Sequence, residues 1–236
     1  MSLKARIATH VHAWEQTRLS GKPRPPETLP FVTISREFGC DAADVAQQLV
    51  ALLNVRFKPV HPWVAYDKEL LDKVASELHL RRDLVDALDG RRRDEMSELF
   101  DTILNHKVDD ALMFRKLAEV IRSLAVHGHS VLIGRGSYLL TQDLKTGTHV
   151  RLVAPRDFRI HDFAHRSDLS PQEAAKQVAN GEKERERYIR TACVQDPTHS
   201  HYHDLIIDRS RFNTTQIAEI ICMALRQRFG DRLANA

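Results

Sequence analysis

The residues with the clearest potential for chemistry form a short loop between an expected strand and an expected helix. Residues 31–34 are an apolar run, and from residue 45 apolar side chains recur at helical spacing. A loop in this position directs backbone N–H groups and the positive end of the helix dipole toward an anion. We therefore predict a phosphate-binding loop, made by Arg36, Gly39, Cys40, Asp41, Ala42, Ala43 and Asp44.

The composition of this loop leaves a second interpretation open. A usual phosphate loop has two glycines, a lysine for the β- and γ-phosphates and a hydroxyl for magnesium. Here the loop has one glycine, no lysine and two carboxylates, Asp41 and Asp44. A carboxylate about 4 Å from a phosphate opposes it by roughly 4 kcal/mol at a near-surface dielectric. Alternatively, Asp41 caps the helix and Asp44 favours its dipole, and the cap then uses amides that a phosphate needs.

Length, composition and charge exclude several classes of protein. The 236 residues, 42% of them hydrophobic, suffice for one large domain with a substantial core. A formal net charge of +3 is too small to predict nucleic-acid binding. We find no apolar run long enough for a membrane span and no signal-peptide core in the first residues. Three cysteines without paired spacing are typical of a reducing compartment, so we expect a cytoplasmic protein that does not bind membranes.

The order of apolar runs predicts the fold class. Strands are expected near residues 31, 63, 130, 149 and 203, with helical segments between them. This alternation is typical of an α/β protein with a mostly parallel five-stranded sheet and right-handed crossovers.

Several helices are expected around this sheet. Two of them cover 155–166 and 171–192, the second capped by Ser170, and the last begins after Asn213. Residues 3–18 also have helical spacing and precede a proline-rich connector. We expect this N-terminal helix to dock on the body of the protein or on a second subunit, which would form a homo-oligomer.

Charged residues gather where the expected strands end. Arg36, Asp67, Arg135 and Asp208 fall at or just after the ends of four strands. In parallel α/β sheets, ligands bind beyond the carboxyl ends of the strands. We therefore expect these side chains to surround one site.

Six segments, taken in order, resemble one known family. Residues 31–39 look like its opening ITISREYG, residues 66–70 like YDKEL, and residues 132–136 like IIGRG. Segments similar to the start of its lid, its DxxRxxY helix and its last strand follow at 150–159, 182–188 and 202–208. On these motifs, over about residues 31 to 221, the chain resembles the bacterial cytidylate kinase-like proteins, which are nucleoside monophosphate kinases with the P-loop fold.

The resemblance implies a domain organisation and an activity. It implies a P-loop NTPase-like α/β fold whose sheet is flanked by helices, with a helical acceptor-binding insert and a helical lid. The expected divisions are an N-terminal helix and linker (1–29), the kinase-like domain (30–225, insert about 67–125, lid about 155–195) and a tail (226–236). The implied reaction moves the γ-phosphoryl of ATP, with Mg²⁺, to a nucleoside monophosphate such as CMP.

The resemblance also assigns roles to single residues. Arg159 and Arg185 match the lid arginines and would clamp the moving phosphoryl as catalytic residues, with Arg166 in reserve. Asp67 and Arg135 would bind the acceptor nucleotide. Structural roles remain open for each of them: Asp67 can cap a helix and Arg135 can form an ion pair. The lid arginines can pair with acidic residues on the lid surface, Glu182, Glu184 or Glu186.

The loop departs from the family pattern. The family continues its opening as GSGGREIA, whereas residues 39–46 read GCDAADVA, so two glycines and an arginine are missing. Arg36 could partly replace the absent lysine, or bond to nearby backbone. A catalytically weak or inactive nucleotide- or anion-binding regulatory protein on the same scaffold is therefore the alternative function.

No metal site built from protein side chains is predicted. His199, His201 and His203 alternate along the chain, which on a strand is compatible with a metal, but no fourth ligand is evident. Asp208 could orient a magnesium-bound water, although a role in ending a strand is simpler.

Overall fold

The computed structural model describes residues 29–71, 108–192 and 200–234. The expected N-terminal helix at 3–18, most of the expected insert and His199 lie outside the described residues. Within the described ranges, no helix combines the length and the apolar character that a membrane span requires.

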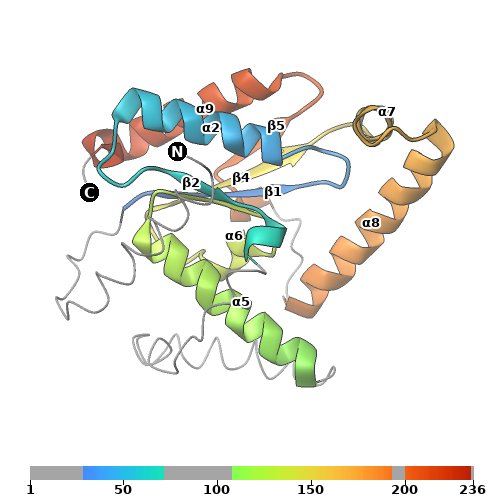
Figure 1. Cartoon of the computed structure of the whole chain (residues 1–236), viewed down its shortest axis with the longest axis horizontal. Helices are drawn as coiled ribbons and strands as arrows, with labels where there is room; N and C mark the ends of the chain where they lie inside the picture. Colours follow the sequence, from blue (N-terminus) through green and yellow to red (C-terminus); the bar gives the residue numbers. More distant parts are fainter. Residues whose placement is uncertain (1–28, 72–107, 193–199, 235–236) are drawn as a thin grey trace.

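A parallel sheet of five strands forms the centre of the molecule (Figure 1). Its strands, in the spatial order β2-β3-β1-β4-β5, are β2 (Val64–Tyr66), β3 (Ser130–Ile133), β1 (Phe31–Arg36), β4 (Gly147–Val153) and β5 (Leu205–Asp208). All four pairings are parallel, with Ile34 opposite Ile133 on one side and Val150 on the other. The predicted five-stranded α/β fold is confirmed, and its strand ends meet at one edge.

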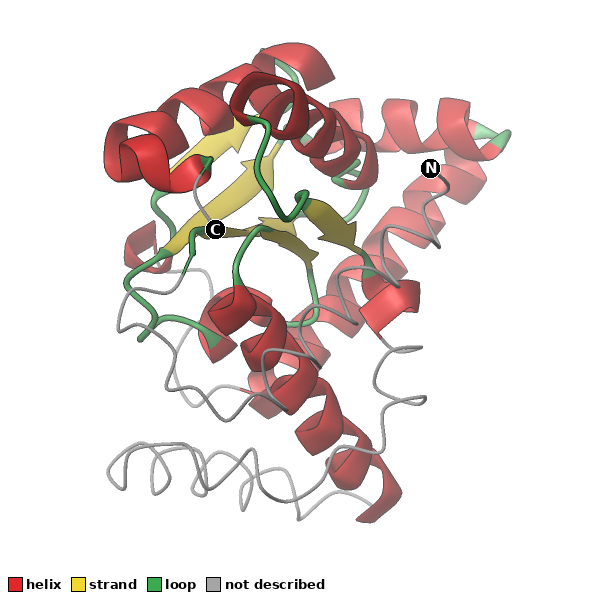
Figure 2. Cartoon of the chain, turned by 60° about the vertical axis from the view of Figure 1, so that its left-hand side comes forward, coloured by secondary structure: helices red, strands yellow, loops and turns green. Residues whose placement is uncertain are grey.

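Helices cover both faces of the sheet (Figure 2). On one face lie α2 (Ala43–Phe57) and α9 (Thr214–Phe229), followed by the short turn η3 (Gly230–Leu233). On the other face lie α5 (Val108–His127) and α6 (Ser137–Leu140). Beyond the carboxyl ends of the strands lie α7 (Arg156–Ser167) and α8 (Pro171–Ala192), and the turn η2 (Ser200–Tyr202) precedes β5.

The alternation of side chains along β1 divides the core in two. Val32 and Ile34 are fully buried against α2 and α9, whereas Phe31 is buried in the cluster formed with α5. Burial on both faces explains why the strand is a continuous apolar run.

The predicted helix starts at Ser170 and Asn213 are confirmed. The Asn213 side chain accepts the Gln216 N–H at 2.9 Å, and the Gln216 side chain accepts the Asn213 N–H in return. Ser170 and Glu173 form the same reciprocal arrangement at the start of α8. Each capping box satisfies amides that the first helical turn leaves without intrahelical partners.

Candidate functional site

The candidate site lies at the carboxyl edge of the sheet, where β1 ends at Arg36 and the loop to α2 begins. Burial lowers the pKa of Arg36, and the charge of nearby Arg135 lowers it further, while Asp41 and Asp67 oppose this effect. These residues come from the ends of three different strands. Three of the four strand-end residues that we expected to converge, Arg36, Asp67 and Arg135, are therefore close enough for their charges to interact.

Arg36 occupies space that a glycine leaves open. A β-carbon at Gly134 would lie 2.2 Å from Arg36 Nη1. Gly134, Arg135 and Gly136 all have positive φ, of 73°, 55° and 67°. Arg135 is thus held in a left-handed conformation that a non-glycine residue adopts at a cost of about 1–2 kcal/mol. This turn after β3 gives Arg36 its position beside Arg135.

Arg185 of α8 joins these two arginines. Its Nη1 donates a hydrogen bond to the Arg36 carbonyl at 2.8 Å, and its guanidinium lies over the Phe38 ring, 5.3 Å from the centroid. Burial lowers the Arg185 pKa, and the charges of Arg36 and of Arg151 on β4 lower it further. The guanidinium nevertheless keeps its charge at neutral pH, as arginines in proteins do.

We refer to Arg36, Arg135, Arg151 and Arg185 as the arginine cluster. All four side chains are partly buried. Among the residues that the structure describes, no carboxylate lies within 4.0 Å of the guanidinium of Arg36, Arg151 or Arg185. The cluster therefore concentrates positive charge that a bound polyanion could neutralise.

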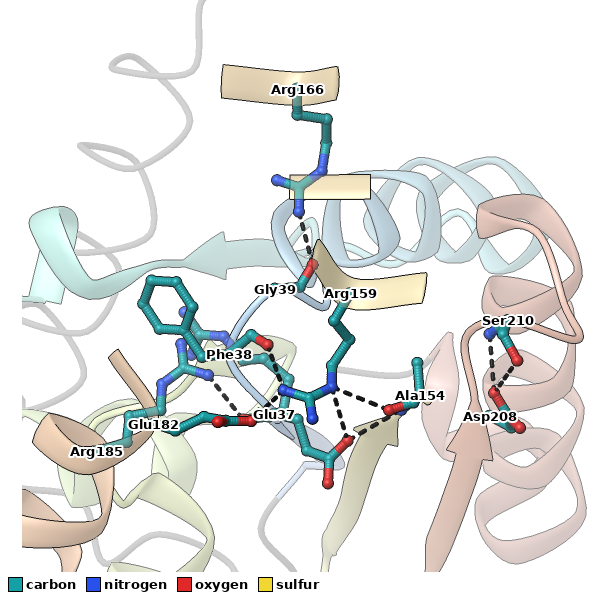
Figure 3. A network of polar contacts seen from close by, with 11 residues as sticks. Glu37, Phe38, Gly39, Ala154, Arg159, Arg166, Glu182, Arg185, Asp208 and Ser210 are labelled. Atoms are coloured by element: carbon teal, nitrogen blue, oxygen red, sulfur yellow. Dashed lines mark hydrogen bonds and ion pairs between the residues drawn. The ribbon is translucent and has the colours of Figure 1, made fainter. Parts of the chain in front are cut away.

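Arg159 has a different environment, inside the protein (Figure 3). Its side chain is 8% exposed. Nε donates to the Ala154 carbonyl, and Nη1 donates to the Phe38 carbonyl, both at 2.9 Å. The Glu182 carboxylate accepts from Nη1 and the Glu37 carboxylate lies 3.4 Å from Nε. Arg159 is thus paired with Glu182, which is the structural role that remained open for it. Its catalytic role stays a prediction.

Arg166 binds the loop from the other side. Its Nη2 donates to the Gly39 carbonyl at 2.7 Å, and its Nε donates to Asp162 at 3.0 Å. A β-carbon at Gly39, whose φ is 93°, would lie 2.8 Å from the Arg159 β-carbon. Helix α7 is therefore packed directly on the loop, and only glycine allows this approach.

The first-turn amides of α2 are partly occupied by the protein itself. Helix α2 begins at Ala43, and the Ala43 N–H donates to Asp41 Oδ1 at 2.8 Å. The structure assigns the N-cap position to Ala42, so the predicted Asp41 cap lies one residue earlier than the cap position. The negative charge of Asp41 raises the pKa of nearby Asp44. The carboxylate of Asp41 thus takes an amide that a phosphate would need.

Cys40 and Asp67 complete the predicted set. Burial raises the pKa of Cys40 to about 11, so its thiol is not ionised at neutral pH. Asp67 Oδ1 accepts the Leu70 N–H at 2.9 Å, so Asp67 caps a helix, as the structural alternative for this residue predicted. This bond uses one oxygen, and contact of the other with an acceptor nucleotide stays a prediction.

Two residues of the site were not predicted from the sequence. Arg151 is a charged residue within the otherwise apolar second half of strand β4. A charge at such a position is a signal in the sequence that the side chain belongs to a functional site. Glu37 accepts the Ala154 N–H at 3.0 Å and approaches Arg159, so it connects the loop to the start of α7. Its position within a loop gave no indication of these partners.

The described carboxylates do not fit a magnesium site. Asp208 Oδ1 accepts both the Ser210 N–H at 2.9 Å and its hydroxyl at 2.6 Å. Asp41 is engaged by Ala43 N–H, and among the described residues no group of three potential ligands is arranged to hold a metal ion. Mg²⁺ is commonly held by nucleotide phosphates and few protein oxygens, so it would have to arrive with the nucleotide.

Comparison with one solved structure supports the fold. An uncharacterized protein from Eubacterium ventriosum ATCC 27560 matches with a TM-score of 0.65 and 19% identity, over 84% of this chain and 99% of its own. TT1252 from Thermus thermophilus, 17% identical over 86% of this chain and 99% of its own, has a TM-score of 0.40. No curated protein matches the chain.

A family model gives the classification. The model of the cytidylate kinase-like family matches residues 31–211. The match covers all five strands, the loop after β1, the arginine cluster and helices α7 and α8. The chain therefore belongs to the cytidylate kinase-like family.

Proposed function

We propose that this protein transfers the γ-phosphoryl group of ATP to a nucleoside monophosphate, with CMP as the first candidate. The observation that carries the proposal is the arginine cluster, where partly buried guanidiniums gather at the carboxyl edge of the sheet. Among the described residues, no carboxylate lies within 4.0 Å of Arg36, Arg151 or Arg185. Such a cluster stabilises a phosphate monoester and the charge that develops during transfer. The family membership adds that the scaffold is one of nucleotide kinases.

The residues would divide the work between binding and positioning. Arg185 and Arg36 would bind phosphate oxygens, because guanidiniums bind them in a bidentate manner. Arg159 would position the lid, since its donors hold the Ala154 and Phe38 carbonyls. Packing of α7 on the loop would exclude water, which limits hydrolysis of ATP. Mg²⁺ bound to ATP would neutralise the donor phosphates.

A second candidate is a nucleotide- or anion-binding regulatory protein without turnover. The specific observation that favours it is the hydrogen bond between Asp41 and the Ala43 N–H, at the helix start that would receive the donor phosphates. Asp44 adds a second carboxylate there. A phosphate entering the loop would have to displace Asp41 and approach both charges.

The test measures ADP formation from ATP and Mg²⁺ with CMP, dCMP, UMP, AMP and GMP. We expect acceptor-dependent ADP that Arg185→Gln reduces at least tenfold. Arg226→Gln, which removes an exposed arginine of α9, is the matched control and should retain wild-type turnover. Binding of CMP without ADP formation would support the second candidate. Absence of both binding and turnover in folded protein would contradict both candidates.

A further inference from the structure

A small polar pocket lies away from the arginine cluster. Gly147 and His149, at the amino end of β4, form part of its wall, whereas the cluster lies at the carboxyl ends of the strands. The pocket has a volume of about 150 Å³. Pockets for drug-sized ligands usually measure about 300–1,000 Å³, so this one suits an ion or a single small group.

Arg228 of α9 contributes unused hydrogen-bond donors to this pocket. Its Nη1 donates to the Gly147 carbonyl at 2.9 Å and to the Thr148 hydroxyl at 3.0 Å. Among the described residues, neither Nε nor Nη2 of Arg228 has an acceptor within hydrogen-bond distance. The Arg228 guanidinium is thus held in place through Nη1, while Nε and Nη2 remain as donors for a ligand.

The charge around the pocket favours an anion. Asp204 is the acidic residue of the lining. Its Oδ2 lies 3.2 Å from Arg228 Nη1 and accepts the backbone N–H of His149 at 2.7 Å, so its charge is compensated. Lys145 is exposed at the rim and adds a second positive charge. Arg228 and Lys145 together carry two positive charges and Asp204 carries one negative charge, so these three residues leave a net charge of +1 at the pocket.

His149 supplies a further polar atom. Its Nδ1 lies 2.9 Å from the Thr33 hydroxyl, so the tautomer that accepts this proton carries its own N–H on Nε2. A β-carbon at Gly147 would lie 3.1 Å from His149 Nε2, so the glycine leaves room beside this atom. Burial lowers the pKa of His149, and the ring is therefore a neutral donor at pH 7.

We propose that this pocket binds a small oxyanion, either a phosphate ion or the phosphate group of a monoester, through Arg228, Lys145 and His149. Metal binding does not explain the pocket, because no three potential ligands among the described residues are arranged around a common ion position. The proposal does not depend on turnover at the arginine cluster.

The test follows histidine side chains of the full-length protein by ¹H–¹⁵N NMR during titration with inorganic phosphate. The signal of His149, assigned with His149→Gln, distinguishes this pocket from the arginine cluster. We expect a saturable shift whose apparent affinity falls at least tenfold in Lys145→Glu. Lys145→Arg and Lys176→Glu, the latter at an exposed lysine of α8, should titrate within twofold of wild type.

Two results would overturn the proposal: a His149 signal that does not shift with phosphate in wild-type protein, or identical titrations of Lys145→Glu and Lys176→Glu. A parallel titration with ribose 5-phosphate identifies the source of the anion. A tighter response to the ester indicates a monoester site, and a tighter response to the free ion indicates a phosphate site.

Discussion

The loop after β1 and the arginine cluster adjoin each other at one edge of the sheet, but they differ in how well their charges are satisfied. In the loop, Asp41 binds the Ala43 N–H, and Arg159 and Arg166 bind the carbonyls of Phe38 and Gly39. In the cluster, Arg36 and Arg185 face each other without a close carboxylate among the described residues. The loop is therefore closed by its own protein contacts, and the proposed function assigns anion binding to the cluster.

The largest expected effect comes from breaking the contacts that join the loop to α7 and α8. Arg159→Ala leaves two carbonyls and the partly buried carboxylates of Glu37 and Glu182 without their donor. We expect the free energy of unfolding to fall by about 3–5 kcal/mol, as for other broken buried pairs, measured by urea denaturation. Arg166→Ala, at a side chain that is 34% exposed, should cost about 1 kcal/mol or less. Equal, small effects would show that Arg159 does not brace the loop.

A smaller effect is expected at the glycine beneath Arg36. Gly134→Ala introduces a β-carbon 2.2 Å from Arg36 Nη1 at a residue with a φ of 73°. The free energy of unfolding should fall by roughly 1–3 kcal/mol, because strain at a left-handed residue has about this cost. CMP affinity, measured by calorimetry, should fall as well, since Arg36 must move. If the CMP affinity of Gly134→Ala equals that of wild type, Arg36 does not contribute to CMP binding.

Neutralising Asp41 should open the loop to ATP. Asp41→Asn retains a side-chain oxygen for the Ala43 N–H but removes the negative charge. We expect ATP to bind at least fivefold more tightly, because the charge within the loop opposes phosphate. Asp231→Asn, in the turn after α9, is the control and should leave ATP affinity unchanged. If Asp41→Asn behaves like this control, the loop charge does not limit ATP binding.

The smallest expected effect is a pH dependence of stability through Asp44. Its pKa is raised in the folded state by Asp41, so the folded state binds more protons than the unfolded state in the window above pH 4. Stability therefore decreases as the pH rises through that window. Asp44→Asn should remove this slope, measured as the urea midpoint between pH 3.5 and 7. If the urea midpoints of wild type and Asp44→Asn differ by the same amount at every pH, the effect of Asp41 on the pKa of Asp44 is contradicted.

Particular residues show how far the sequence alone predicts this molecule. The apolar run at β1 and the capping residues Ser170 and Asn213 carry local signals, and both strand and helix starts follow from them. The end of β5 at Asp208 is likewise local. In contrast, the inward position of Arg159 depends on which side of α7 packs on the loop. That packing is a tertiary contact between distant segments, so helical spacing cannot predict it.

The central claim, that anion affinity resides in the arginine cluster and not in the loop, is tested most directly by calorimetric titration of CMP and of ATP into the same proteins. We predict that wild-type protein binds CMP more tightly than ATP. Arg185→Gln should weaken CMP binding at least tenfold, while Arg226→Gln leaves it unchanged. Tight ATP binding with Asp41 in place, together with CMP binding that survives Arg185→Gln, would contradict the claim.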